Sequence, residues 1–132
     1  AYFCLVYHSK KATEINPEEW VRQHVIHYLI NEKFYPIGLI ASEFSIEING
    51  LVRRCDIVVF DKEKTPILIV ECKATDEEIN EKVLHQIAQY NFKLNTSFLF
   101  LTNGVMKVTC KINRSEQTLS YLKELPNFKD LK

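Results

Sequence analysis

The chain lacks a net charge, because 17 lysine and arginine residues balance 17 aspartate and glutamate residues. A balanced chain has no overall basic field that attracts a polyanion, so any affinity for nucleic acid has to come from local patches. No apolar run is long enough to cross a membrane. The opening run, residues 1–7, also lacks the basic start and cleavage site of a signal peptide. We therefore expect a soluble, cytoplasmic protein without membrane contact.

Cysteine, glycine and proline are scarce, with four, three and four residues respectively. The cysteines lie far apart within apolar stretches, and the sequence contains no Cys-x-x-Cys pair and no histidine at zinc-finger spacing. This pattern is typical of reduced thiols in the core of a protein from a reducing compartment, and it argues against structural zinc. The four residues are Cys4, Cys55, Cys72 and Cys110.

The composition that remains is that of an ordinary globular domain. Of the 132 residues, 46% are hydrophobic and 26% are charged, which is enough apolar material for a real core. No linker, internal repeat or low-complexity tract divides the chain. We predict a single domain over residues 1–132, with its core in about residues 17–112.

The first part of the chain predicts a hairpin and then a helix. Residues 2–7 and 12–14 surround a polar turn, which indicates a short hairpin. Asn16 is a good N-cap, Pro17 suits the first helical position, and a glutamate follows at the third. We expect this helix to reach about Lys33. Its apolar stripe consists of Val21, Val25 and Leu29.

The middle of the chain predicts three strands. Polar and apolar residues alternate over residues 43–48, the dipeptide Asn49-Gly50 is a strong signal for a two-residue hairpin, and residues 51–60 form the return strand. After a polar turn, residues 67–73 form a run apolar enough for a strand that is buried on both faces. We expect this third strand to lie in the centre of the sheet.

The last part predicts a second helix and another hairpin. The helix, capped by Thr75 or Asp76, should reach about residue 92. A strand over residues 97–102 then meets a second Asn-Gly dipeptide, and residues 105–112 return.

Residues 116–125 fit either a short helix or an edge strand. The predicted order is therefore helix, three strands, helix and strand, with an added hairpin at each end. This order indicates an α/β sandwich with a mixed sheet.

Charged residues interrupt the apolar third strand where it ends. Glu71 and Lys73 share one face of the strand because side chains alternate, while Cys72 points the other way. Burying such a pair costs several kcal/mol unless the charges pair or bind something. Counting back from the turn, Asp56 of the preceding strand falls at a similar height. In that strand we expect one face to carry Asp56 together with Val52, Arg54, Val58 and Phe60. The sequence thus predicts two carboxylates and one ammonium group close together.

Two carboxylates, a backbone carbonyl and retained waters are ligands that suit Mg²⁺, and Mn²⁺ can take its place. A bound metal would polarise a phosphoryl oxygen and help to generate hydroxide at neutral pH. Lys73 could position the attacking water or stabilise charge on the phosphate. A purely structural ion network is the alternative interpretation of the same residues.

The residues around these charges resemble a known family. Residues 54–59 and 69–74, Arg-Cys-Asp-Ile-Val-Val and Ile-Val-Glu-Cys-Lys-Ala, resemble the D…E-x-K signature of the PD-(D/E)XK nuclease superfamily. Residues 86–90 spell Q-x-x-x-Y, the extra motif of the type I restriction enzyme R-subunit branch. Residues 17–23 and 102–104 also resemble the R protein N-terminal domain family. The resemblance covers about residues 17–107, and its one departure is a cysteine where the superfamily name has proline.

The resemblance implies a restriction-endonuclease-like α/β fold, in which helices flank the mixed sheet of an αβββαβ core with added hairpins. The family places an acidic residue of the first helix near the metal. Helix phase favours Glu18, which shares the apolar stripe, over Glu19, which suits a capping box; simple stabilisation of the helix dipole is the alternative for both. The implied metal ligands are Glu18, Asp56, Glu71 and Cys72.

The resemblance also implies roles for the remaining motif residues. The implied catalytic residues are Asp56, Glu71, Lys73, Gln86 and Tyr90. Nucleic-acid contacts are expected from Arg54, which belongs to a local basic pair, and from Gln86 and Tyr90. We expect the last two to fall on the apolar seam of the second helix with Val83. A mutual contact of this amide and phenol, one helical turn apart, is the alternative to a functional role.

The function indicated is a magnesium-dependent DNA endonuclease domain that hydrolyses phosphodiester bonds. The partners implied are DNA, translocase or specificity subunits, and a second copy of the chain. A catalytically silent nucleic-acid-binding or assembly module with the same fold is the alternative, which the neutral charge favours. A sandwich with accidental carboxylates is a third interpretation.

Overall fold

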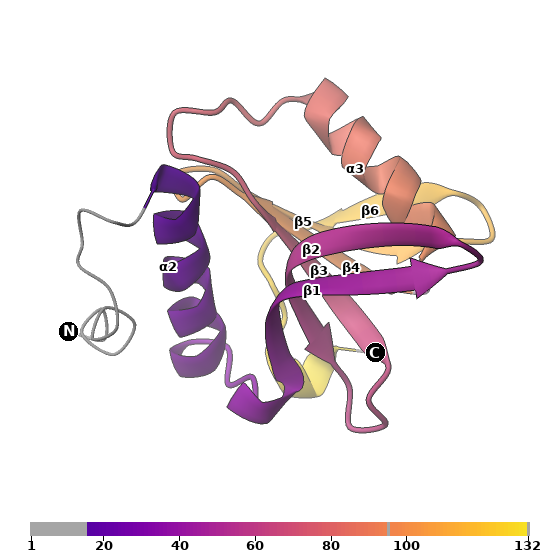
Figure 1. The fold of residues 1–132 in the computed structure, drawn as a ribbon, viewed down its shortest axis with the longest axis horizontal. Coiled ribbons are helices and arrows are strands. Elements are labelled where there is room, and N and C mark those ends of the chain that lie inside the picture. The colour runs from indigo at the N-terminus through magenta and orange to yellow at the C-terminus, as the bar shows by residue number, and fades with distance from the viewer. Residues whose placement is uncertain (1–15, 95, 132) are drawn as a thin grey trace.

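The computed structural model describes residues 16–94 and 96–131, so the predicted hairpin over residues 2–14 lies outside the described residues. Six strands form one mixed sheet in the order β1-β2-β3-β4-β5-β6, with α2 on one face and α3 on the other (Figure 1). The elements are α2 (Pro17–Asn31), η2 (Ile37–Leu39), β1 (Ile40–Ile48), β2 (Leu51–Phe60), β3 (Pro66–Cys72), α3 (Glu81–Lys93), β4 (Phe98–Thr102), β5 (Lys107–Asn113), β6 (Thr118–Leu122) and η3 (Phe128–Asp130).

Helix α2 begins where its capping residues predict. The Asn16 side chain accepts a hydrogen bond from the backbone N–H of Glu19 at 2.7 Å, and Pro17 takes the first helical position. The predicted stripe of Val21, Val25 and Leu29 is buried against the sheet. No helix within residues 16–94 and 96–131 is long and apolar enough to span a bilayer.

Helix α3 begins later than predicted. Its N-cap is Asn80, whose side chain accepts from the N–H of Val83 at 3.0 Å, and not Thr75 or Asp76. Residues 73–80 form a loop instead. Tertiary contacts hold this loop, because the backbone oxygen of Glu77 accepts a hydrogen bond from the distant Asn103 side chain. A local capping signal was therefore not enough to start the helix there.

The first Asn-Gly dipeptide forms the predicted tight turn between β1 and β2. Asn49 and Gly50 both have positive φ angles, 52° and 81°, as a type I′ hairpin requires. The second dipeptide does not form a two-residue turn. Thr102 pairs with Lys107, so residues 103–106 make a four-residue loop before β5. Residues 118–122 then form the strand β6 at the sheet edge, which decides between the helix and strand alternatives.

Strand β3 lies in the interior of the sheet, as predicted. It pairs antiparallel with β2 and parallel with β4. The residues of β3 from Leu68 to Cys72 are buried, and successive side chains enter the cores beneath the two helices. The register joins Ile57 to Val70, so one step further along the two strands places Asp56 opposite Glu71. The two carboxylates therefore lie at the same height, as predicted.

Strand β2 does not keep a single alternation of faces, and the prediction that Asp56 shares a face with Val52, Arg54, Val58 and Phe60 is wrong. Cys55 and Val58 belong to the same buried cluster, which is impossible in a regular strand. The β1–β2 register omits one pair, Glu43 with Asp56, and Glu43 has a φ of 53° within β1. This local irregularity switches the faces at Asp56.

Candidate active site

The predicted signature residues meet where β3 ends. Asp56, from β2, accepts a hydrogen bond at its Oδ2 from the backbone N–H of Cys72 at 2.8 Å. The irregular strand at Asp56 thus directs this carboxylate at the last residue of β3. Since the N–H and C=O of one strand residue point to the same edge, the carbonyl of Cys72 faces the same side as the carboxylate.

Glu71 is buried, with only 8% of its surface exposed, and it forms an ion pair with Arg53 of β2. Burial raises the pKa of Glu71; the Arg53 guanidinium opposes this rise and the Asp56 carboxylate adds to it. The guanidinium carbon of Arg53 lies 4.6 Å from the ring centroid of Tyr90 on α3. Glu71, Arg53 and Tyr90 therefore form a layered cluster on the α3 face.

Lys73 follows β3 directly and extends its parallel pairing. Its backbone N–H donates to the backbone oxygen of Thr102 at 2.8 Å. Its ammonium group lowers the pKa of Glu18 and of Glu71, although burial, the larger influence, raises the pKa of both. The lysine charge therefore acts on both carboxyl groups.

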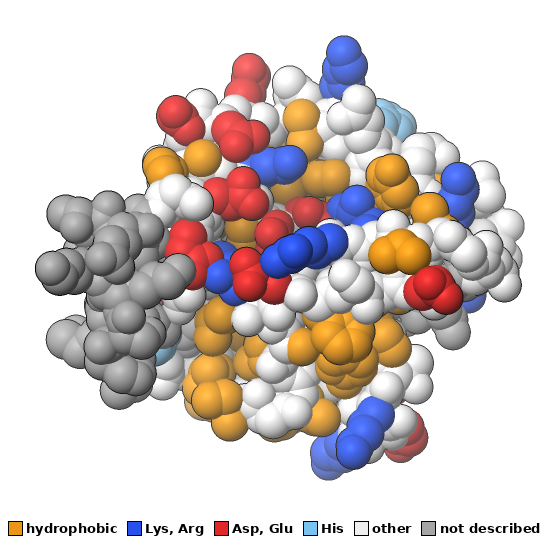
Figure 2. Space-filling model, viewed as in Figure 1, with side chains coloured by type: hydrophobic (Ala, Val, Ile, Leu, Met, Phe, Trp, Pro, Cys, Tyr) orange, Lys and Arg blue, Asp and Glu red, His pale blue; other side chains and the backbone are white. Residues whose placement is uncertain are grey.

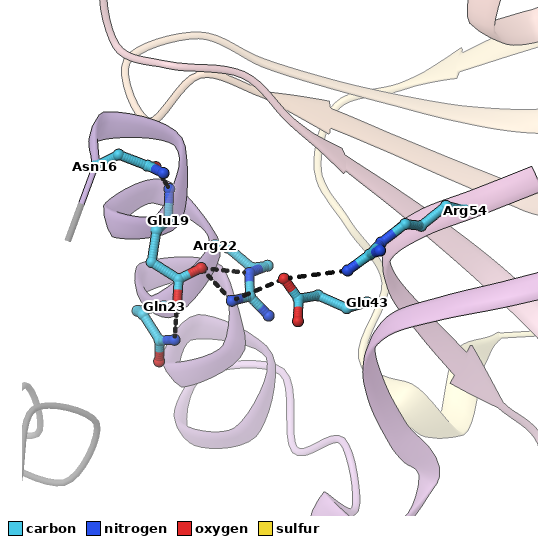
Figure 3. A network of polar contacts seen from close by, with 6 residues as sticks. All are labelled: Asn16, Glu19, Arg22, Gln23, Glu43 and Arg54. Atoms are coloured by element: carbon cyan, nitrogen blue, oxygen red, sulfur yellow. Dashed lines mark hydrogen bonds and ion pairs between the residues drawn. The ribbon is translucent and has the colours of Figure 1, made fainter. Parts of the chain in front are cut away.

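The two glutamates that open α2 have different surroundings. The Glu19 carboxylate accepts hydrogen bonds from Arg22 Nε at 2.8 Å and from Gln23 Nε2 at 3.0 Å (Figure 3). The pKa of Glu18 is raised by partial burial and, next in size, by the Asp56 carboxylate. The negative charge of Asp56 in the candidate site therefore acts on Glu18, whereas Glu19 forms hydrogen bonds with residues of its own helix.

Glu43 joins α2 to β2 across the mouth of the site. Its Oε1 lies 3.7 Å from Arg22 Nη2 and 3.5 Å from Arg54 Nη2, so its carboxylate points between the two guanidinium groups (Figure 3). An open cavity of about 290 Å³ lies here, and its lining includes Glu18, Glu43 and Asp56. Figure 2 shows the acidic and basic side chains gathered between α2 and the β1–β2 hairpin.

The two residues of the Q-x-x-x-Y motif lie on the outer part of α3. The prediction that they fall on its apolar seam is wrong, because the buried seam consists of Leu84, Ile87, Ala88 and Asn91. Gln86 is exposed and Tyr90 is 43% exposed. A one-residue error in helix phase explains this difference. Tyr90 reaches the site through Arg53, whereas Gln86 remains on the surface of α3.

The Thr-Asn-Gly segment after β4 holds the loop that follows Lys73. Asn103 is buried, and its Nδ2 donates to the backbone oxygen of Glu77 at 2.8 Å. Its Oδ1 accepts from the N–H groups of Val105 and Met106, at 2.9 and 2.7 Å. The side chain of one residue therefore organises its own loop and the loop of residues 73–80 together.

Sequence reasoning missed three residues of this region: Arg53, Glu43 and Asn103. In the sequence, Arg53 stands out only as the neighbour of Arg54 in a basic pair, because the switch of faces that directs it toward Glu71 is not visible in the alternation. The backbone of Glu43 gives no sequence signal. An asparagine before a glycine at the end of an apolar strand is a usable signal for Asn103, but the same dipeptide also predicts a tight turn.

The donor set suits a hard divalent cation in its chemistry, since Asp56, Glu71 and the Cys72 carbonyl supply oxygen atoms. The Cys72 thiol does not belong to this set, because it is 1% exposed within the α2-side core and its pKa is raised by burial. In the described part of the chain, no three His, Cys, Asp or Glu residues already form a metal-binding group. Glu71 is held by Arg53 instead.

Comparisons with known proteins agree with this fold. A fragment of a candidate HsdR subunit of a type I restriction enzyme from Vibrio vulnificus YJ016 is 17% identical with a TM-score of 0.59, over 89% of this chain and 24% of that chain. A candidate nuclease belonging to DUF820 from Anabaena variabilis ATCC 29413 is 14% identical with a TM-score of 0.55, over 86% of this chain and 74% of that chain. At these identities the likeness shows the fold alone.

No curated protein matches the chain significantly. The family described as type I restriction enzyme R protein N terminus matches residues 17–126, which include every predicted site residue. The restriction-endonuclease-like mixed α/β fold is confirmed by the six-stranded sheet with its two helices and by the structural relatives. The chain belongs to the family of the type I restriction enzyme R protein N terminus.

Proposed function

We propose that this domain is a metal-dependent DNA endonuclease that hydrolyses phosphodiester bonds. The observation that supports it is the meeting of two carboxylates and an ammonium group at the end of β3. Asp56 accepts a hydrogen bond from the backbone N–H of Cys72, Glu71 lies opposite Asp56 in the strand register, and the Lys73 charge acts on Glu71. The family of this chain is named for the N terminus of type I restriction enzyme R proteins, and a structural relative is described as a candidate nuclease.

Asp56, Glu71 and the backbone carbonyl of Cys72 would hold Mg²⁺ or Mn²⁺, with Glu18 contributing from α2. Such an ion supplies Lewis-acid activation of the phosphoryl oxygen and lowers the pKa of a bound water. Hard cations of this kind keep several water ligands, so few protein ligands suffice.

The other residues would act on the substrate directly. Lys73 would stabilise charge that develops on the phosphate, or orient the attacking water. Arg54 is 70% exposed at its side chain and stands beside the cavity of the site, where it can reach a backbone phosphate. Gln86 and Tyr90 are exposed on α3 and would contact the nucleic acid there.

The wider assembly is part of the same proposal. The chain spans 24% of the length of the Vibrio vulnificus protein, which is described as a candidate subunit of a type I restriction enzyme. We propose that the domain serves such a system in the cytoplasm, with DNA, a translocase and a specificity subunit as partners. A second copy of the chain would allow both strands to be cut.

The proposal is tested by incubating the chain with Mg²⁺ or Mn²⁺ and supercoiled, linear or single-stranded DNA. Lys73→Ala should lower the cleavage rate by roughly 10²–10³-fold, the usual loss when a group that stabilises transition-state charge is removed. Lys62→Ala, in the exposed turn after β2, is the matched control and should cut normally. A chelator should abolish cleavage. Cutting that survives Lys73→Ala and Asp56→Ala in full would refute the assignment.

A catalytically silent binding or assembly module is the second candidate. The observation that favours it is the ion pair of Glu71 with Arg53, which leaves the carboxylates of the described residues without a preformed metal group. Such a module would bind DNA or a protein subunit equally well with and without Mg²⁺, and it would never cut. Measuring DNA affinity and cleavage in parallel separates the two functions.

A further inference from the structure

Arg53 and Glu71 form a buried ion pair inside the candidate active site. Their side chains are 14% and 10% exposed, and a guanidinium N–H of Arg53 donates to Glu71 Oε1. A buried carboxylate requires a compensating positive charge, since neither the solvent nor the apolar walls of β2 and β3 can supply one. In the structure, Arg53 supplies that charge.

A divalent cation at Asp56 and Glu71 would supply the same compensation. Glu71 can then satisfy its charge in two ways, through Arg53 or through the metal. The two cations would stand next to the same carboxylate and repel each other strongly in surroundings of low dielectric constant. Binding of one therefore weakens binding of the other.

The structure also provides a place for the displaced guanidinium. Arg53 stacks on Tyr90, with its guanidinium carbon 4.6 Å from the ring centroid, and Tyr90 is 43% exposed. Stacking on an aromatic face holds an arginine without a carboxylate. The Arg53 Nε is buried and has no hydrogen-bond partner among the described residues. The guanidinium is therefore fully satisfied neither by Glu71 nor by its other neighbours.

We propose that Arg53 is an exchangeable counter-ion of Glu71, which occupies this carboxylate in the metal-free domain and gives it up to the divalent cation. This inference rests on the proposed function, because it uses the metal site assigned there. It makes Arg53 a positioning residue that sets metal affinity through Glu71. Tyr90 keeps the guanidinium in place when the ion pair opens.

The test is calorimetric titration of Mn²⁺ into the chain and its variants, with no DNA present. Arg53→Met removes the competing charge, so Mn²⁺ should bind about tenfold tighter, in line with the coupling between close charges. Lys62→Met removes an equal charge from the exposed turn after β2, away from the candidate site. Its affinity should stay within about threefold of the unsubstituted chain.

Further variants keep the inference open to refutation. Arg53→Lys retains the charge and should bind Mn²⁺ nearly as the unsubstituted chain does. If Arg53→Met does not fold, Arg53→Gln removes the charge while keeping a hydrogen-bond donor, and it should also bind Mn²⁺ more tightly. Glu71→Gln should abolish binding in either background. Unchanged or weaker Mn²⁺ affinity in folded Arg53→Met or Arg53→Gln would overturn the inference.

The result is distinguishable from failure of the proposed nuclease. If the chain binds Mn²⁺ with the predicted effect of Arg53→Met but never cuts DNA, the counter-ion role stands and the nuclease proposal fails. If the chain cuts DNA and Arg53→Met does not tighten Mn²⁺ binding, the nuclease proposal stands alone. If neither the chain nor any variant binds Mn²⁺, both are refuted.

Discussion

The same dipeptide, Asn-Gly, occurs twice in this chain and does two different things. At residues 49–50 both backbones are left-handed, the residues are exposed, and nothing stands within 4 Å of a side chain built on Gly50. At residues 103–104 only Gly104 has a positive φ, 91°, and Asn103 is buried. The first pair only reverses the chain, while the second connects two loops beside the candidate site.

An Asn-Gly turn signal therefore describes only which conformations the backbone can adopt. Asn49 lies in the exposed two-residue turn between β1 and β2, so local geometry alone decides its conformation. Asn103 has an unpaired carbonyl within reach, that of Glu77, and its amide group satisfies it. Substituting the glycine and the asparagine of each dipeptide in turn measures how much more residues 103–104 contribute to stability than residues 49–50.

The largest effect is expected from the glycines. Gly104→Ala should destabilise the domain by about 2–4 kcal/mol, because strain from the left-handed backbone adds to overpacking. A Cβ there would lie 3.3 Å from Val21 Cγ2 and 3.5 Å from Thr75 Cγ2. Gly50→Ala carries only the strain, about 1–2 kcal/mol. Urea unfolding of the two variants measures both losses, and equal losses would show that packing at Gly104 contributes nothing.

The asparagines should differ next. Asn103→Asp keeps the acceptor for Val105 and Met106 but replaces the donor to Glu77 with a second oxygen. Losing this part-buried hydrogen bond and placing a carboxylate oxygen against the Glu77 carbonyl should cost about 1–3 kcal/mol. Asn49→Asp should change stability by less than about 0.5 kcal/mol, since aspartate tolerates the same exposed turn. Thermal unfolding of both variants tests this, and a larger loss at Asn49 would reverse the comparison.

A functional difference of about tenfold should accompany the structural one, if the domain is the nuclease proposed. Asn103→Asp loosens the loop after Lys73, and small misplacement of a catalytic group slows a reaction markedly. At a temperature where the variant is folded, its cleavage rate should fall about tenfold, while Asn49→Asp cuts normally.

Hydrogen exchange gives the control for this prediction. Exchange should quicken in residues 74–80 of Asn103→Asp and stay unchanged in the β1–β2 hairpin. Slower cleavage without faster exchange in that loop would contradict the positioning role of Asn103, and faster exchange throughout the domain would indicate general destabilisation instead.

The smallest effect concerns pH and sets the conditions for these measurements. Burial, aided by the nearby His24, lowers the pKa of His27 below its ordinary value of 6.5. The unfolded chain then binds the proton at a higher pH than the folded one, so stability is lost as the pH falls through that ordinary value. Between pH 7.5 and pH 5.5 the unsubstituted chain should therefore lose more stability, or gain less, than His27→Gln does in thermal unfolding. An identical change in the two chains would exclude a contribution from His27.

Sequence patterns correctly predicted the elements that are set by neighbouring residues in the chain. The N-cap Asn16, the tight turn at Asn49 and the buried run of β3 each depend on neighbours in the chain, and the structure has them where predicted. The same counting placed Asp56 and Glu71 at one height. Local patterns were wrong where hydrogen bonds to distant residues set the backbone, as at the start of α3 and in the loop after Thr102.

The candidate site divides in the same way. Periodicity and turn chemistry are properties of short segments, so the amino-acid order alone predicts the charged residues at the end of an apolar strand and the mixed α/β sheet around them. Tertiary contacts select the arginine that compensates Glu71, which is Arg53 and not Arg54. This selection depends on the irregularity at Glu43 and Asp56. Such an irregularity arises from the pairing of β1 with β2 and cannot be predicted from either strand alone.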